Sequence, residues 1–274
     1  EYQRQYSLAG DPADRGKYVL GVLRESAGRG GSALMHRAFR EGRRVFITKP
    51  ANHFPLHEDA SMSLLFAGGI GVTPMIAMAH RLHALGKPFA LHYSAAGRST
   101  AGFLRDLAQV PWKDKVFCHF KDEGARADLP ALMPPYADGM HVYTCGAPRY
   151  MDGVFAAATA RGWPEEAMHR EYFSVPEADA WVNHAFTLRL ARSGRTVEIP
   201  ADRSATDVLA QAGIKVDTKC SDGLCGVCAT AYDASASGAV EHRDFVLGRK
   251  EREHKLILCC SRAKEPGGEL VVDL

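Results

Sequence analysis

The sequence lacks several features that would point to a membrane or nucleic-acid protein. None of its apolar runs reaches the roughly 18 residues that a transmembrane helix needs, and no signal peptide is visible. The formal net charge is only +2, which gives no electrostatic reason to expect nucleic-acid binding. We therefore expect a cytoplasmic protein with no nucleic-acid partner and no membrane segment.

Cysteines are few and odd in number. The seven among 274 residues indicate a reducing cytosol in which some thiols are reserved for metal. Cys220, Cys225 and Cys228 have the C-x4-C-x2-C spacing of plant-type [2Fe–2S] sites, whose fourth thiolate comes from far downstream. Gly223 and Gly226 allow this loop to adopt positive φ and to turn its amides toward the sulfurs.

The fourth ligand is expected from the adjacent pair Cys259 and Cys260. We choose Cys259, because it directly ends the apolar run 256–258. The competing interpretations are a zinc site and buried inert thiols. Zinc knuckles usually pair two C-x2-C turns, and this chain has only one such turn, so the spacing favours an iron–sulfur cluster.

The first 60 residues alternate short apolar runs with turn residues. Residues 18–23 and 44–47 are predicted strands, and residues 33–39, after the glycine-rich turn 28–32, are predicted to be helical. Such a turn at a helix start offers N–H groups to a phosphate, although most such turns are only turns. The chain begins without methionine inside an expected strand, so we expect the natural protein to begin earlier.

Residues 61–175 change to alternating strands and helices. The continuous apolar run 63–67 is typical of a buried parallel strand. Gly68–Gly71 then turns into Thr73–Pro74, the predicted helix start, and further strands are expected at 89–93 and 140–144. This alternation predicts a doubly wound parallel sheet with ligands at the carboxyl ends of its strands.

The strict dinucleotide-binding fingerprint is absent from this region. Pro74 stands where the third glycine would be, and no acidic residue follows the second strand to hold a ribose 2′-hydroxyl. Arg98 is the only cation in the loop after that strand. The sequence therefore leaves the choice between NADH and NADPH open.

The last 90 residues predict a small mixed sheet crossed by one helix. A hairpin is expected at 186–199, a helix at 202–213, and strands at 228–232 and 269–273. Residues 241–244, which include His242, are predicted to form a solvated polar turn rather than a metal site.

Taken together, the motifs resemble the ferredoxin reductase superfamily. Their order along the chain resembles the reductase components of two-component Rieske oxygenases, of the phthalate dioxygenase reductase type and vanillate O-demethylase reductases in particular. The resemblance is carried by residues 4–8, 68–74, 162–166, 169–173 and 259–263. It implies a multi-domain protein in which residues 1–60 form an N-terminally incomplete antiparallel β-barrel that binds flavin and residues 61–175 form an α/β doubly wound domain that binds NAD(P). Residues 176–184 would be a linker, and residues 185–274 an α+β ferredoxin domain of the β-grasp type.

The resemblance also implies the cofactors FMN, NADH (or NADPH) and a 2Fe–2S cluster, with site residues as follows. Arg4, Tyr6, Ser7, Leu23, Arg24, Gly30, Gly31, Ser32 and Phe173 would contact the flavin; Gly69, Gly71, Thr73, Cys145 and Gly146 the nucleotide; and Cys220, Cys225, Cys228 and Cys259 the iron. On sequence alone, Phe173 is equally well a packing residue. Ala147 replaces the proline that the family has after its cysteine and glycine.

The implied function is electron transfer. Hydride from NAD(P)H would pass to FMN, and single electrons would leave through the cluster to a Rieske-type oxygenase that acts on an aromatic compound. No general acid or nucleophile is required. The alternatives are a reductase for another acceptor, such as a diiron or haem monooxygenase, and a flavin and iron–sulfur redox sensor without turnover.

Overall fold

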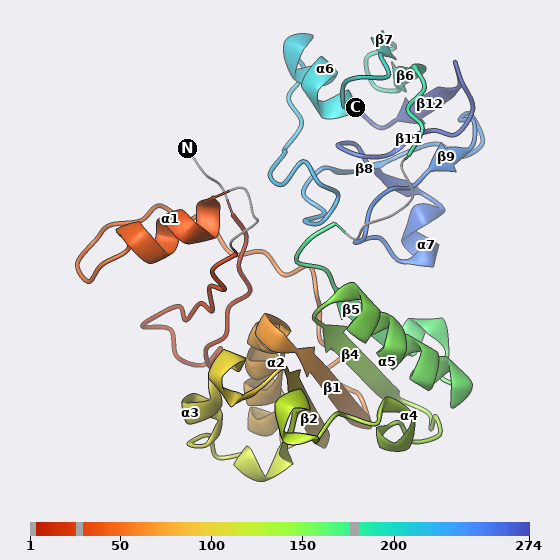
Figure 1. The fold of residues 1–274 in the computed structure, drawn as a ribbon. Coiled ribbons are helices and arrows are strands. Elements are labelled where there is room, and N and C mark those ends of the chain that lie inside the picture. Colours follow the sequence, from red (N-terminus) through yellow and green to blue (C-terminus); the bar gives the residue numbers. More distant parts are fainter. Residues whose placement is uncertain (1–3, 26–29, 176–180) are drawn as a thin grey trace. The chain divides into compact units, whose positions relative to one another are not determined.

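The computed structural model describes residues 4–25, 30–175 and 181–274, which form two compact units, Glu1–Phe173 and Ser174–Leu274 (Figure 1). Most of the predicted linker, residues 176–180, lies outside the described residues. Among the described helices, none has both the length and the apolar character needed to cross a bilayer.

The first unit is built on a five-stranded parallel sheet. Its order is β3 (Val116–Phe120), β2 (Phe89–Ala95), β1 (Met62–Gly68), β4 (Met140–Cys145) and β5 (Met168–Glu171). The longer helices are α2 (Val72–Ala84) and α5 (Pro148–Ala160), and the short ones are α3 (Leu104–Leu107), α4 (Leu129–Leu132), η1 (Gly69–Gly71), η2 (Arg98–Thr100), η3 (Lys113–Lys115), η4 (Lys121–Glu123) and η5 (Glu165–Ala167).

Successive residues of β1 face two different cores. Leu65 packs with the buried face of α2, whereas Leu64 and Phe66 pack with Val154 of α5. Because both faces are covered, residues 64–67 of the strand are apolar without alternation, and Ser63 is a buried polar residue at its start. The predicted doubly wound arrangement of this sheet is therefore what the structure shows.

Helix α2 begins earlier than predicted. Gly71 is its N-cap and Val72 its first residue, so Thr73 and Pro74 lie inside the first turn. The Thr73 hydroxyl donates to the Ile70 carbonyl at 3.0 Å instead of capping the helix. The prediction missed this because the preceding 3-10 turn η1 (Gly69–Gly71) leads directly into the helix.

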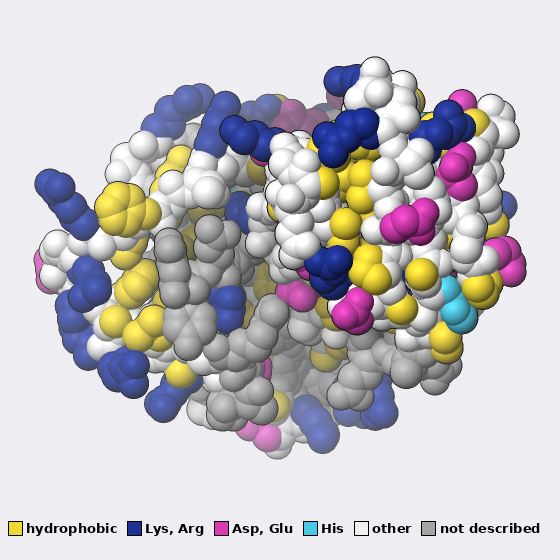
Figure 2. Space-filling view, turned by 90° about the horizontal axis from the view of Figure 1, so that it is seen from above, with side chains coloured by type: hydrophobic (Ala, Val, Ile, Leu, Met, Phe, Trp, Pro, Cys, Tyr) yellow, Lys and Arg dark blue, Asp and Glu magenta, His cyan; other side chains and the backbone are white. Residues whose placement is uncertain are grey.

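The strands expected at 18–23 and 44–47 do not form in the described part of the first 60 residues. Among the described residues of this region, the regular structure consists of α1 (Gly31–Ala38) and an isolated antiparallel bridge from Leu8 to Leu20, so the predictions for 18–23 and 44–47 were wrong. Strand-like patterns form strands only where a neighbouring backbone accepts their hydrogen bonds. Val45, Phe46 and Ile47 are instead exposed, and Figure 2 shows hydrophobic and basic side chains intermingled over the part of the molecule that carries α1.

The second unit has a mixed sheet of β12 (Glu269–Val272), β6 (Phe186–Leu190) and β7 (Thr196–Ile199), in which β12 and β6 are parallel and β6 and β7 antiparallel. Two antiparallel pairs join β8 (Ala229–Ala231) to β10 (Lys255–Ile257) and β9 (Val240–Glu241) to β11 (Arg262–Ala263). The helices are α6 (Ala205–Gln211) and α7 (Arg249–Arg252). Residues from β6, α6 and β12 share one core with Cys228 and Cys259.

Candidate functional site

Four cysteines from two distant segments meet in the second unit. The sulfur of Cys259 is in hydrogen-bonding contact with those of Cys220 and Cys228, and Cys220 is in the same contact with Cys225. The hydrogen bonds from Cys225 and Cys259 lower the pKa of Cys220, which favours the thiolate, the form that binds metal. The structure thus brings together all four residues predicted as iron ligands.

The loop between the first two of these cysteines turns its backbone toward sulfur. The Asp222 N–H donates to Cys220 Sγ at 3.4 Å, and the Val227 N–H donates to Cys225. Gly223 and Gly226 have φ of 72° and 68°, as the sequence predicted. Such N–H···S contacts stabilise negative charge on the sulfurs, as a thiolate-ligated cluster requires.

The spacing of the sulfurs distinguishes two kinds of metal centre. Four thiolates on one zinc ion, each about 2.3 Å from it, would all lie within about 4 Å of one another. In the part of the chain that the structure describes, no three of these sulfurs all lie within 4.8 Å of one another. The contacts run from Cys225 through Cys220 and Cys259 to Cys228, an elongated arrangement that fits a two-iron core.

A buried carboxylate supports the cysteine loop from behind. Gly223 accepts a hydrogen bond from the Phe245 N–H at 3.1 Å, and a Cβ on Gly223 would lie 3.2 Å from the Asp244 Cα and 2.8 Å from Cys260 Sγ. Asp244 is only 3% exposed, so the prediction of a solvated turn at 241–244 was wrong. The pattern misled because the partners of this carboxylate lie farther along the chain.

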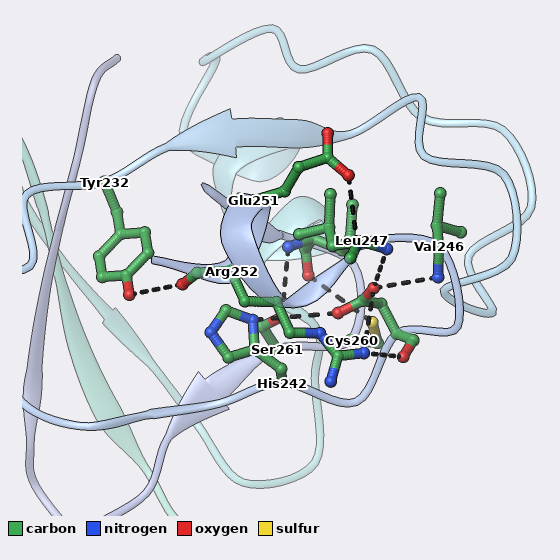
Figure 3. Close-up of polar contacts among 11 residues, drawn as sticks. Tyr232, His242, Val246, Leu247, Glu251, Arg252, Cys260 and Ser261 are labelled. Atoms are coloured by element: carbon green, nitrogen blue, oxygen red, sulfur yellow. Dashed lines mark hydrogen bonds and ion pairs between the residues drawn. The ribbon is translucent and has the colours of Figure 1, made fainter. Parts of the chain in front are cut away.

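Those partners converge on Asp244 from one turn and one helix. Its Oδ1 accepts the N–H groups of Val246 at 3.1 Å and Leu247 at 2.7 Å, and Arg252 Nη2 lies 3.5 Å away (Figure 3). The Tyr232 hydroxyl donates to the Arg252 carbonyl at 2.9 Å. The carboxylate thereby fixes the turn that contacts Gly223.

Asp244→Ala is expected to destabilise the second unit by about 2–4 kcal/mol, because it leaves the N–H groups of Val246 and Leu247 without their acceptor and removes the ion pair to Arg252. The Arg252 guanidinium would keep its 2.7 Å hydrogen bond to the backbone carbonyl of residue 244. Cluster release on heating, followed by visible absorbance, should occur at a lower temperature. The control is Asp273→Ala, which removes an ion pair to Arg192 whose side chains are both at least half exposed and should change stability by less than about 1 kcal/mol. Equal effects of the two substitutions would contradict this role for Asp244.

A second candidate site lies at the carboxyl ends of β1 and β4. A Cβ on Gly71 would overlap the carbonyl oxygen of Cys145, and a Cβ on Gly146 would lie 2.9 Å from the Gly68 Cα. The two turns therefore touch through backbone alone. Gly69 has φ of 56° and open space beside it. The predicted nucleotide residues are brought together here, with the buried Thr73 bound to the turn rather than facing outward.

Sequence reasoning missed Tyr150 at this edge. Its ring lies 2.9 Å from the position that a Cβ on Gly68 would occupy, and Ser94 donates to its hydroxyl at 3.3 Å. Burial raises the pKa of Tyr150 to about 12, so its hydroxyl stays protonated. An aromatic on the first turn of α5 was visible in the sequence, but nothing in the pattern placed it over the glycine turn.

The residues predicted to hold a flavin fall into two groups. The Arg4 side chain lies against Gly31, because a Cβ added at Gly31 would be 2.7 Å from the Arg4 Nε. The Ser32 hydroxyl accepts a hydrogen bond from the Glu25 N–H at 3.0 Å. Gly30 has φ of 82° and caps α1. Arg4, Gly30, Gly31 and Ser32 thus lie around one helix start, with N–H groups and a cation suited to a phosphate.

The other flavin residues are more scattered. Tyr6 is half-buried, and this burial raises its pKa despite the charge of Arg4. Leu23 and Arg24 are exposed, and Phe173 is 45% exposed at the end of the first unit. Ser7 donates to Glu171 Oε2 at 3.0 Å, which places it beside β5 rather than with Arg4.

Glu171 is a half-buried carboxylate that the sequence reasoning did not select. It is the last residue of β5, paired with Cys145 of β4, and burial raises its pKa although the bond from Ser7 lowers it. Burial, and to a lesser extent the negative charge of Glu171, also raises the pKa of Cys145. The Cys145 thiol therefore stays protonated and is no nucleophile. The position of Glu171 inside the motif 169–173 was the available signal.

Glu171→Gln is expected to stabilise the first unit at pH 8 by about 1 kcal/mol, because the folded state disfavours the charged carboxylate. The raised folded-state pKa of Glu171 means that the wild-type protein is most stable below the unfolded-state pKa and loses stability as pH rises through the folded-state pKa. The difference in unfolding free energy between wild type and Glu171→Gln should therefore disappear near pH 4. Urea unfolding followed by tryptophan fluorescence would measure it, since Trp112 and Trp163 are buried in this unit. A difference that does not vary with pH would contradict the assignment.

Known proteins match both parts of this arrangement. Residues 188–264 match the family of 2Fe-2S iron-sulfur cluster binding domains. The vanillate O-demethylase oxidoreductase of Pseudomonas sp. (strain HR199 / DSM 7063) is 39% identical over 275 residues, covering 99% of this chain and 85% of that protein. A solved structure of phthalate dioxygenase reductase, described as modular for electron transfer from pyridine nucleotides to [2Fe-2S], has a TM-score of 0.66 and 39% identity over 99% of this chain and 83% of that chain.

A third relative is a larger protein. The structure of an intact type IV self-sufficient cytochrome P450 monooxygenase matches with a TM-score of 0.87 and 37% identity, over 99% of this chain and 35% of that one. The cysteine site and the matching domain define an oxidoreductase with a 2Fe–2S domain. More narrowly, the chain belongs to the family of oxygenase reductases that includes phthalate dioxygenase reductase and vanillate O-demethylase oxidoreductase, as its motifs indicated.

Proposed function

We propose that this protein takes hydride from NADH onto FMN and passes single electrons through its 2Fe–2S cluster to a Rieske-type oxygenase that oxidises or O-demethylates an aromatic compound. Nicotinamide supplies two electrons as hydride, a cluster accepts one at a time, and a flavin can exchange either number. The observation that carries the proposal is the convergence of Cys220, Cys225, Cys228 and Cys259 in a chain of this family.

The parts are assigned as the sequence predicted. Residues 1–60 are proposed as the partial flavin barrel, 61–175 as the NAD(P) domain, 176–184 as the linker and 185–274 as the β-grasp ferredoxin domain. The proposed flavin residues are Arg4, Tyr6, Ser7, Leu23, Arg24, Gly30, Gly31, Ser32 and Phe173, and the proposed nucleotide residues are Gly69, Gly71, Thr73, Cys145 and Gly146. The arrangement of glycines against Cys145 supports the second set, and the helix start at Gly30 supports the first.

Carboxylates near the end of β2 favour NADH over NADPH. Arg98 is held by two hydrogen bonds from its guanidinium to Glu123, at 2.6 and 3.2 Å. The Asp122 N–H donates to the Ala96 carbonyl at 3.0 Å, and its carboxylate lies where a Cβ on Gly97 would be. The dinucleotide-binding fingerprint expects an acidic residue after the second strand, and in this proposal Asp122, which follows the third strand, takes that role. Negative charge there suits a ribose hydroxyl and repels a 2′-phosphate.

A haem-containing oxygenase is the second candidate acceptor. It is favoured by the 37% identity and TM-score of 0.87 to part of a self-sufficient cytochrome P450 monooxygenase. The cysteine loop exposes Ser221, and its neighbours 222 and 224 are half-buried, so either partner would meet a small surface there. Small contact areas are usual for transient electron-transfer complexes.

The visible spectrum of the purified protein during NADH titration tests the proposal. Bleaching of flavin and cluster bands, followed by steady reduction of cytochrome c with a higher kcat/KM for NADH than for NADPH, is expected. Binding without turnover would instead support a redox sensor. Stopped-flow oxidation of the reduced cluster by a Rieske oxygenase and by a P450 haem domain would then decide between the two acceptors.

A further inference from the structure

Three histidines outside the redox sites meet in the first unit. His57 precedes β1, His141 is on β4 and His169 is on β5, and their ligand-capable nitrogens all lie within 4.8 Å of one another. His141 Nδ1 lies 2.8 Å from His169 Nε2. The His57 ring is almost parallel to that of His141, with centroids 4.2 Å apart, and its centroid is 4.9 Å from that of His169.

The fold holds these side chains on one face of the sheet. Tyr143 is paired with His169, and His141 lies two residues before Tyr143, so all three point the same way. The backbone N–H of His57 donates to the Tyr143 hydroxyl at 2.8 Å, which fixes His57 over that face of the sheet. Arg81 of α2 donates two hydrogen bonds of 2.7 Å to Glu58 and anchors the same segment.

The chemical state of the two half-buried rings, His141 and His169, suits coordination. Burial, and then the neighbouring histidines, lower the pKa of His141 and lower that of His169 to about 3. Both rings are therefore neutral at pH 7 and offer a lone pair without competition from a proton. His57 is exposed and leaves a path from solvent to the group.

We propose that His57, His141 and His169 bind one divalent transition-metal ion, Zn²⁺ in the first place, with water in the fourth position. Imidazole nitrogen suits zinc, copper and nickel, whereas calcium and magnesium require oxygen. Three nitrogens at about 2.0–2.1 Å from zinc lie about 3.4 Å apart, within the range that these atoms span. Binding replaces the hydrogen bond between His141 and His169 and turns the rings about the soft χ2 torsion.

The site is separate from the proposed nucleotide edge. Cys145 and Glu171 lie four and two residues farther along the strands that carry His141 and His169. The ion would join the segment before β1 to strands β4 and β5. It would therefore stabilise the first unit without a part in electron transfer.

Zinc uptake by the intact holoprotein tests the site. The protein is incubated with ZnCl₂ and desalted, and zinc and iron per chain are measured; unchanged iron excludes exchange at the cysteines. Wild type should retain one zinc and show a melting temperature raised by about 5 °C. His57→Gln, a change at an exposed residue, and the double variant His141→Gln/His169→Gln should retain none and show no shift.

A second histidine pair in the same sheet is the control. His92 Nδ1 of β2 lies 3.2 Å from His119 Nε2 of β3, but no third ligand completes a metal site there among the described residues. His92→Gln/His119→Gln should retain zinc as wild type does. Zinc retained by the His57→Gln chain, its absence from wild type, or its loss from the control variant would each overturn the proposal.

Discussion

Cys259→Ser is expected to remove the iron–sulfur cluster, whereas Cys260→Ser leaves it in place. The Cys259 sulfur is in contact with those of Cys220 and Cys228, so its loss opens the site from the side opposite the loop. The Cys260 sulfur donates instead to the Ile257 carbonyl at 3.7 Å, although it also touches Cys259. The two adjacent thiols therefore form a matched pair of substitutions.

Iron per chain and the cluster absorbance would measure this difference directly. In the Cys259→Ser protein both should fall to background, and cytochrome c reduction should fall with them, because the exit for single electrons is gone. Reduction of ferricyanide, which can take electrons from a flavin, should persist and would show that the first unit is intact. Retention of the brown colour by Cys259→Ser together with its loss from Cys260→Ser would reverse the ligand assignment.

Gly71→Ala is expected to abolish NADH oxidation and to destabilise the first unit by about 3 kcal/mol or more. The added Cβ would overlap the backbone carbonyl of Cys145 and lie 2.8 Å from the Gly146 nitrogen. A backbone neighbour cannot rotate away as a side chain can, so the ends of β1 and β4 must separate. The proposed nucleotide edge would then come apart.

Gly102→Ala is the matched control, since the Cβ that this substitution adds would have no neighbour within 4 Å and the backbone of Gly102 is not left-handed. It should leave NADH oxidation unchanged and shift stability by less than about 1 kcal/mol in either direction. Urea unfolding by tryptophan fluorescence and NADH-dependent ferricyanide reduction would compare the two variants. Normal NADH kinetics in Gly71→Ala would place the nucleotide elsewhere.

Predictions from the sequence succeeded where a residue pattern has a single physical explanation. Residues 64–67 of the predicted strand 63–67 are apolar on both faces, as a strand covered on both sides requires, and they lie in β1. The C-x4-C-x2-C spacing with Gly223 and Gly226 likewise anticipated the positive φ values and the inward amides. The prediction of the fold was therefore accurate for the parallel sheet and the cysteine loop.

Predictions failed where the outcome depends on distant partners. Residues 18–23 and 44–47 have strand-like patterns, yet in the described chain the first segment pairs only through the Leu8–Leu20 bridge and the Ala9 bond to Val19, and the second is in no strand. Asp244 lies in a polar run, and its burial follows from its partners in residues 246–252 and from packing against Gly223, which is 21 positions earlier in the sequence. Glu171 became a candidate only when the sheet register placed it beside Cys145.

The hydrogen bond from Phe245 to Gly223 ties the metal-binding loop to the turn around Asp244. Metal ligation by the cysteines contributes to the folding free energy of the second unit. In a cell short of iron, the metal-binding loop and the turn around Asp244 would therefore lose their order together. The first unit has its own sheet and cores and would survive that shortage. Proteolytic turnover of this reductase during iron starvation should therefore begin at its carboxyl-terminal third.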